Sequence, residues 1–237
     1  SASAGGATNA DELQNTTERA VCLADNLFKE TPLKPAITGE SAYPGTVPLE
    51  NHTTYRARQT AYYSMLSGAQ GYSMGVCGVY SGGLGCGNWD PQDVGLQRTI
   101  DSMKELRTVF QTLPSSWLRL LPQATSRILD PESDATKKMV LAYDGRSAVL
   151  AYVPNQVPAI RISFHEIPGL EGISQFKEPW VATWINPRTG ATASAQPPDG
   201  QGGVFLFTKP VAPTGSDPAT CERYEIAGTM DCNDWVL

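Results

Sequence analysis

The chain has 237 residues, of which 41% are hydrophobic and 18% are charged, and its formal net charge is −6. This hydrophobic fraction excludes a wholly disordered chain, and the length allows one large domain or two smaller ones. The acidic balance and the lack of a basic cluster argue against nucleic acid as a partner, because phosphate recognition needs a concentrated positive surface. No apolar run reaches about 18 residues, so we expect no membrane-spanning helix and no membrane partner.

The cysteines favour an oxidising compartment. Four of the 5 cysteines form two local pairs, Cys77 with Cys86 and Cys221 with Cys232, and each pair is expected to be a disulfide. Cys22 is left over. It is either a buried thiol or the partner of a cysteine outside this chain.

Two sequons and the first residues of the chain agree with a secreted, extracellular glycoprotein. Asn15 and Asn51 each begin an Asn-X-Thr sequon, which is a glycosylation acceptor in a secreted protein. The chain opens at Ser1 with small and polar residues and has no signal-peptide pattern. Either a signal has been removed before Ser1, or the chain is a piece of a longer protein.

The first part of the chain alternates helices with short strands. Helical spacing of apolar residues predicts helices over 9–30, 53–68 and 93–111, and short strands are expected at 36–38 and 72–76. This order is typical of an α/β domain with parallel strands. Two parallel strands cannot bury both faces of a sheet, so we expect this part to be incomplete by itself.

The pattern changes after about residue 114. Short apolar or alternating segments follow, separated by turn signals such as 144–145, 187–190 and 199–200. This is typical of an antiparallel β-sandwich, so the expected fold class is α/β plus all-β, with domains over 1–113 and 114–237. The expected strands are 138–142, 147–153, 159–164, 180–186, 204–208 and 234–237.

Glu40 is the first candidate for a catalytic carboxylate, because it follows the expected strand at 36–38. In (β/α)₈ barrels the active site is built where strands end and loops converge. On position alone, a capping or salt-bridged glutamate is the competing interpretation. Glu50, which has His52 beside it, is a second candidate of the same kind.

Other chemistries find little support in the sequence. Only 2 histidines occur and no Cys-X-X-Cys pair accompanies them, so we expect no metal and no cofactor. Tyr80 and Trp89 lie in and after the glycine-rich loop between Cys77 and Cys86, where they either stack on a sugar ring or pack the loop against the domain.

Several blocks resemble one family, the apiosidase-like glycoside hydrolases. Residues 34–43, KPAITGESAY, resemble the strand of these enzymes that ends in Gly-Glu-Pro-X-Tyr-Glu, and 56–75 is similar to the following helix and last barrel strand. The later blocks are similar to their C-terminal β-sandwich, which is often labelled collagen-binding. These blocks are 144–149, 184–190 and 234–237.

The resemblance implies a (β/α)₈ barrel in which Glu40, on the seventh strand, is catalytic. It also implies that strands 1 to 6 and the second carboxylate lie outside this chain. The substrate loop departs from the family pattern, because Ser41 replaces a proline and Pro44 replaces the second glutamate of the motif. Val76-Cys77 stands where relatives often carry histidines.

The expected function is hydrolysis of a glycosidic bond in a plant or microbial polysaccharide or oligosaccharide side chain, of apiosidase- or furanosidase-like type. Glu40 supplies one carboxylate. The partner is the N-terminal part of the same enzyme, nicked or separate, and this chain alone is expected to be inert. Tyr43, Arg58, Tyr80 and Trp89 are expected to line the sugar site. Arg58 would orient Glu40 or a substrate hydroxyl, unless it is an ordinary helix-surface arginine.

The alternative function is a carbohydrate- or matrix-binding β-sandwich with an inactive barrel remnant. An exposed line of aromatic side chains would favour it, but we interpret the aromatic residues of this part as core. A sandwich that only stabilises the barrel is the third interpretation, and we prefer it to binding. The aromatic residues concerned are Tyr143, Tyr152, Trp180 and Trp184.

Overall fold

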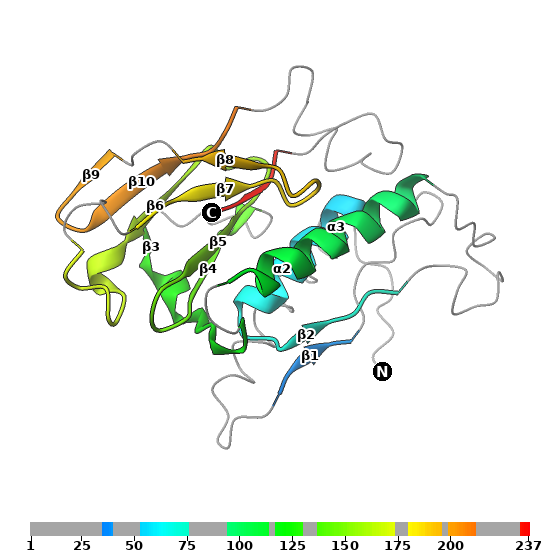
Figure 1. Ribbon diagram of the computed structural model, residues 1–237, viewed down its shortest axis with the longest axis horizontal. Helices are drawn as coiled ribbons and strands as arrows, with labels where there is room; N and C mark the ends of the chain where they lie inside the picture. The colour runs from blue at the N-terminus through cyan, green and yellow to red at the C-terminus, as the bar shows by residue number, and fades with distance from the viewer. Residues whose placement is uncertain are drawn as a thin grey trace, which may run out of the picture.

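The chain is described by a computed structural model in which helices lie between a small parallel sheet and two antiparallel sheets (Figure 1). Neither described helix is long and apolar enough to cross a membrane. The helix expected at 9–30 lies outside the described residues. The described ranges are 35–39, 53–75, 94–113, 117–129, 137–173, 180–195, 199–211 and 233–237.

The N-terminal elements follow a β-α-β-α order. Strand β1 (Ile37–Thr38) pairs in parallel with β2 (Gly71–Tyr72), and helix α2 (Thr54–Leu66) connects them. Helix α3 (Val94–Gln111) follows β2 and packs beside α2. Both helices and β1 lie where the sequence pattern predicts them, whereas β2 is shorter than the expected strand over 72–76.

Helix α2 is defined by local signals at both ends and is covered on all sides. At its start, the Thr53 hydroxyl accepts a hydrogen bond from the Arg56 backbone N–H at 3.1 Å, a typical N-cap. At its end, Gly68 adopts a left-handed φ of 105°, which glycine adopts without strain. Every side chain of the helix is buried, so the helix has no solvent face despite carrying Arg56 and Arg58.

The remaining described strands form two antiparallel sheets, one in the order β3-β6-β10-β9 and the other in the order β4-β5-β11-β7-β8. One apolar core includes side chains from both sheets, among them Leu141, Trp184, Ile162, Phe205 and Phe207. The strands are β3 (Ile128–Leu129), β4 (Val140–Tyr143), β5 (Val149–Val153), β6 (Ala159–Ser163), β7 (Thr183–Ile185), β8 (Thr192–Ser194), β9 (Asp199–Gln201), β10 (Val204–Thr208) and β11 (Trp235–Val236). Short 3₁₀ helices cover Trp117–Arg119, Pro122–Arg127 and Phe164–Glu166.

The turn expected at 199–200 is wrong. Both residues belong to β9, which pairs with β10 through Gln201 opposite Val204. The reversal is made by Gly202 and Gly203, whose φ values of 62° and 85° are both left-handed. Two consecutive positive φ angles are typical of a tight hairpin turn, and glycine accommodates them at little cost.

A second apolar cluster joins the helices to the five-stranded sheet. It contains Tyr62, Leu66, Phe110 and Tyr152, from α2, α3 and β5. The Tyr62 and Tyr152 rings stack at a centroid distance of 5.1 Å and an interplanar angle of 10°. Because side chains from both parts fill this cluster, the helices and the sheet are held by one continuous packing surface.

Candidate functional site

The pairing of β1 with β2 fixes the edge of the small sheet at which β1 ends, shortly before Glu40 in the sequence. Thr38 ends β1, and its carbonyl accepts a hydrogen bond of 2.8 Å from the Ser73 N–H just after β2. The two parallel strands therefore end at the same edge of the small sheet. Gly39 is the last described residue before Glu40, and Glu40 itself lies outside the described residues.

Most of the other predicted site residues also lie outside the described residues, so their roles stay predictions. The set covers the aromatic residues expected to line the sugar site, the cysteines, the glycosylation sites, and the second candidate for a catalytic carboxylate with the histidine beside it. Its members are Tyr43, Tyr80, Trp89, Cys22, Cys77, Cys86, Cys221, Cys232, Asn15, Asn51, Glu50 and His52.

Arg58 is the one predicted sugar-site residue that the structure describes. Its side chain is 0% exposed, so its interpretation as a helix-surface arginine is wrong. Its Nε and Nη2 donate to the two carboxylate oxygens of Asp234 at 2.8 and 2.9 Å, and Nη1 donates to the Ser102 hydroxyl at 3.3 Å. This two-pronged geometry is the strongest form of arginine–carboxylate pairing. A role for Arg58 at the sugar site stays a prediction.

Asp234 receives further support from the sheet. The Tyr152 hydroxyl donates to Asp234 Oδ2 at 2.9 Å. Burial by itself would raise the pKa of Asp234, but the charge and hydrogen bonds of Arg58, with help from Arg188 and Tyr152, hold that pKa below its usual value. Burial and the neighbouring Asp234 charge raise the pKa of Tyr152 well above its ordinary range. The carboxylate is therefore ionised and the phenol neutral at any ordinary pH.

Other polar side chains on α2 form a second set of buried hydrogen bonds. The Gln59 amide donates to the Tyr63 hydroxyl at 3.1 Å and to the Tyr55 hydroxyl at 3.3 Å. The Tyr63 hydroxyl in turn donates to the Lys138 carbonyl at 2.6 Å. The Arg58 guanidinium lies over the Tyr55 ring, 5.7 Å from its centroid. Specific partners thus satisfy Gln59 and Tyr63, whereas the buried Tyr62 hydroxyl and Ser64 hydroxyl have no hydrogen-bond partner among the described residues.

Lys209 is another buried basic side chain, and its pKa is affected by Asp234. Its ammonium donates to the carbonyls of Pro154 and Asn155, both at 2.8 Å. Burial lowers the pKa of Lys209 to about 7; Asp234 opposes this shift and Arg188 adds to it. The contacts tie the end of β10 to the turn after β5.

The hydrogen bonds around Arg58 and Asp234 connect the helical part of the fold to the five-stranded sheet. They join α2 to β5 and to the residue before β11, through groups that are paired and shielded from water. Among the described residues, no group of three or more His, Cys, Asp or Glu side chains is placed to hold a metal ion. The sequence does not indicate that Asp234 pairs with Arg58, because the two residues are 176 positions apart, or that the Tyr152 hydroxyl donates to Asp234.

Solved structures share this fold. One, described as a glycoside hydrolase, matches with a TM-score of 0.65 and 21% identity over 94% of this chain and 46% of its own length. Another, a glycoside hydrolase family 5 protein from Bacteroides vulgatus ATCC 8482, matches with a TM-score of 0.65 and 20% identity over 94% of this chain and 45% of its own. No protein-family model and no curated protein matches the chain. The chain therefore has the fold of a part of these proteins and spans less than half of their length.

Proposed function

We propose that this chain is the C-terminal part of a glycoside hydrolase, with the last strands and helices of a (β/α)₈ barrel over 1–113 and a β-sandwich over 114–237. The support is the parallel β1-α2-β2-α3 order together with the two antiparallel sheets around one core. The solved structures that share the fold carry the name glycoside hydrolase, and this chain covers 46% and 45% of them.

One observation carries the catalytic assignment. Strand β1 ends at Thr38, at the same edge of the small sheet as β2, and Glu40 follows two positions later in the sequence. In barrels of this kind the loops at that edge build the active site. A glutamate there meets a substrate that lies across the strand ends.

Glycoside hydrolysis needs two carboxyl groups on either side of the scissile bond. They stand roughly 5 to 5.5 Å apart in retaining enzymes and roughly 6.5 to 9.5 Å apart in inverting ones. Glu40 supplies one of them, as nucleophile or general base, and the N-terminal part of the barrel supplies the acid. The substrate is a polysaccharide or an oligosaccharide side chain of apiosidase- or furanosidase-like type, with Tyr43, Tyr80 and Trp89 lining the sugar site.

The antiparallel part stabilises the barrel and does not bind carbohydrate or matrix by itself. The support is the buried Arg58–Asp234 pair, which joins α2 to the five-stranded sheet. Three of the aromatic side chains that could have formed a binding face are buried instead. They are Tyr143, Tyr152 and Trp184. In the whole enzyme this part holds the last barrel helices in place.

Secretion, the two local disulfides and the glycans at Asn15 and Asn51 belong to the same proposal. Their support is the spacing of the cysteines and the two sequons. Non-reducing and reducing peptide maps of the secreted protein test the pairings. A free thiol at Cys77 or Cys221 would contradict them.

The catalytic proposal is tested by combining this chain with the N-terminal part of the barrel and assaying a panel of nitrophenyl glycosides that includes furanosides. Glu40→Gln is expected to lower kcat by about 10²- to 10⁴-fold, the usual contribution of an acid–base carboxylate. Glu171→Gln is the matched control, because Glu171 is an exposed carboxylate on a turn of the antiparallel part. Near wild-type turnover in Glu40→Gln would contradict the proposal.

A further inference from the structure

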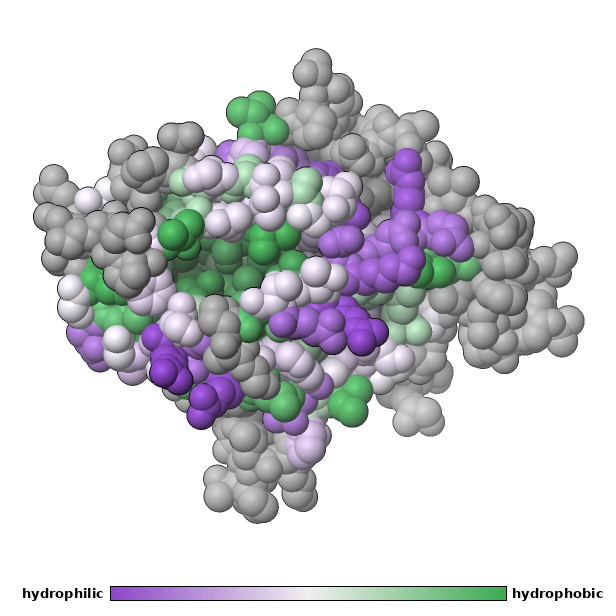
Figure 2. All heavy atoms as spheres, viewed as in Figure 1, coloured by the Kyte–Doolittle hydropathy of each residue, from purple (hydrophilic) through white to green (hydrophobic). Residues whose placement is uncertain are grey.

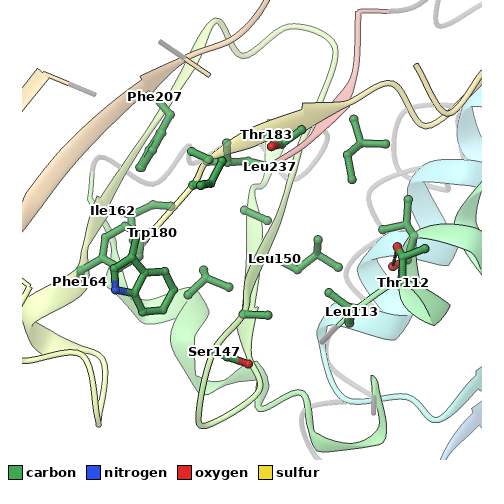
Figure 3. Close-up of a pocket in the computed structure, with 17 residues that line it drawn as sticks. Thr112, Leu113, Ser147, Leu150, Ile162, Phe164, Trp180, Thr183, Phe207 and Leu237 are labelled. Carbon is green, nitrogen blue, oxygen red and sulfur yellow. Dashed lines mark hydrogen bonds between the residues drawn. The ribbon is translucent and has the colours of Figure 1, made fainter. Parts of the chain in front are cut away.

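The two ends of the helix pair formed by α2 and α3 meet the antiparallel part in different ways. Just after the end of α3, Thr112 and Leu113 line a cavity of about 360 Å³, whose other lining side chains include Leu150 of β5 and Thr183 of β7 (Figure 3). Figure 2 shows this cavity as a hollow with hydrophobic atoms at its base. At the start of α2, by contrast, buried side chains form hydrogen bonds with α3 and with a turn of the antiparallel part. Specific polar contacts therefore hold the start of α2.

The start of α2 lies at the edge of the small sheet where β1 and β2 end. The two strands are parallel and α2 connects them, so α2 runs back along the sheet and begins on the side where β1 finishes (Figure 1). In the sequence, Glu40 falls between Thr38, the last residue of β1, and Thr53, the N-cap of α2. The position of β1 therefore sets one end of the segment that carries Glu40, and the first turn of α2 sets the other.

The first turn of α2 is buried and is tied on two sides. Each of its residues is at most 6% exposed. On one side, the Thr54 hydroxyl forms a hydrogen bond of 2.8 Å with the Thr99 hydroxyl of α3. On the other side, the Tyr55 hydroxyl accepts a hydrogen bond of 3.4 Å from the Asn155 backbone N–H, in the turn after β5. Tyr55 therefore links the first turn of α2 to the antiparallel part.

The turn that contacts Tyr55 is itself fixed from two directions. The Asn155 carbonyl accepts a hydrogen bond of 2.8 Å from the Lys209 side chain, at the end of β10. Asn155 Oδ1 accepts one of 2.7 Å from the Asn233 backbone N–H, just before β11. Because three segments of the antiparallel part meet at this buried asparagine, the turn is a firm support for Tyr55.

We propose that Tyr55 is a positioning residue for the candidate catalytic carboxylate: it seats the first turn of α2 on the Asn155 turn and so sets one end of the segment that carries Glu40. This inference rests on the proposed glycosidase function, and it gives the antiparallel part a role in turnover as well as in stability. Catalytic groups depend on supporting residues around them, because a misplacement of about 1 Å can lower a rate by about 10²-fold.

The test compares Tyr55→Phe with Tyr63→Phe, its matched control on the same helix. Both tyrosines are fully buried, and both hydroxyls accept a hydrogen bond from the Gln59 amide. Each hydroxyl also has one contact with the antiparallel part, since that of Tyr63 donates to the Lys138 carbonyl. The two variants therefore lose comparable hydrogen bonds, but Tyr55 lies in the first turn of α2 and Tyr63 in the third.

Kinetics are measured in the enzyme reassembled from this chain and the N-terminal part of the barrel, with the panel of nitrophenyl glycosides. Both variants are expected to melt below the parent. Tyr55→Phe is expected to lower kcat by about tenfold, with KM within about twofold of the parent value, whereas Tyr63→Phe keeps kcat within about twofold. Equal losses of kcat in the two variants would show a purely structural role for both hydroxyls and would overturn the proposal.

Hydrogen exchange in this chain alone gives a readout that does not involve activity. The Arg56 and Ala57 amides donate to the Thr53 hydroxyl and carbonyl, so their exchange reports opening of the first turn. Exchange at both amides is expected to be about tenfold faster in Tyr55→Phe than in Tyr63→Phe. Equal exchange in the two variants would overturn the proposal even if Glu40 is catalytic. Near wild-type turnover in Glu40→Gln, with faster exchange in Tyr55→Phe, would instead overturn the glycosidase role of Glu40 and support the seating of α2 by Tyr55.

Discussion

Removing Asp234 tests whether the buried ion pair holds the two parts of the fold together. In Asp234→Ala the Arg58 guanidinium, 0% exposed, stays buried without its counter-charge. Breaking a buried pair from one side costs about 3 to 5 kcal/mol. At roughly 2 to 4 °C per kcal/mol for a chain of this size, the melting temperature is expected to fall by about 6 to 20 °C.

The assay is urea unfolding followed by tryptophan fluorescence and by far-ultraviolet circular dichroism, with the slope m compared between variants. The double variant Arg58→Met/Asp234→Leu is expected to recover most of the lost stability, because it removes the unpaired charge along with its partner. A double variant no more stable than either single variant would show that the two side chains act separately.

An exposed pair on α3 provides the matched control. Lys104 and Asp101 have the same 2.8 Å separation as Arg58 and Asp234, but their side chains are 66% and 56% exposed. Such a pair contributes little, so Asp101→Ala should leave the melting temperature close to that of the parent chain. A loss in Asp234→Ala as small as the loss in Asp101→Ala would show that the buried pair does not hold the two parts of the fold together.

Two further predictions concern pH and the hairpin turn. An unfolded lysine keeps its proton to about pH 10.4, whereas Lys209 has a folded-state pKa of about 7, so the folded state binds fewer protons in between. The free energy of unfolding should therefore rise from pH 7 to 9, and a slope in Lys209→Met equal to the parent's would contradict this assignment. Gly203→Ala should destabilise more than Gly202→Ala, because a Cβ at Gly203 would lie 2.7 Å from His165 Cβ whereas Gly202 faces open space. Equal melting temperatures for the two glycine variants would contradict it.

Local signals are enough to predict the helices and several strands. The apolar spacing over 53–68 and 93–111 predicts α2 and α3, because apolar side chains of both helices pack into one core cluster. The apolar or alternating segments predict β5 and β10, because side chains of both strands are buried. β8 (Thr192–Ser194) was missed, because three small or polar residues carry no apolar signal and the strand depends on its pairing with β7.

The sequence does not indicate which residues far apart in the chain contact each other. An arginine on a helix is ordinarily solvated, and no residue near Arg58 in the sequence indicates that it pairs with a carboxylate. Only the fold brings Asp234 beside the Arg58 guanidinium. It also brings the Tyr152 hydroxyl within hydrogen-bonding distance of the same carboxylate.

The most direct test of the account is chemical rescue of Glu40 in the enzyme reassembled from this chain and the N-terminal part of the barrel. Glu40→Ala removes the carboxylate, and azide can take the place of the nucleophile or of the water that this carboxylate activates. If Glu40 is catalytic, turnover in Glu40→Ala falls by about 10²-fold or more and is partly restored by azide with formation of a glycosyl azide. Near wild-type turnover in Glu40→Ala without azide would contradict it.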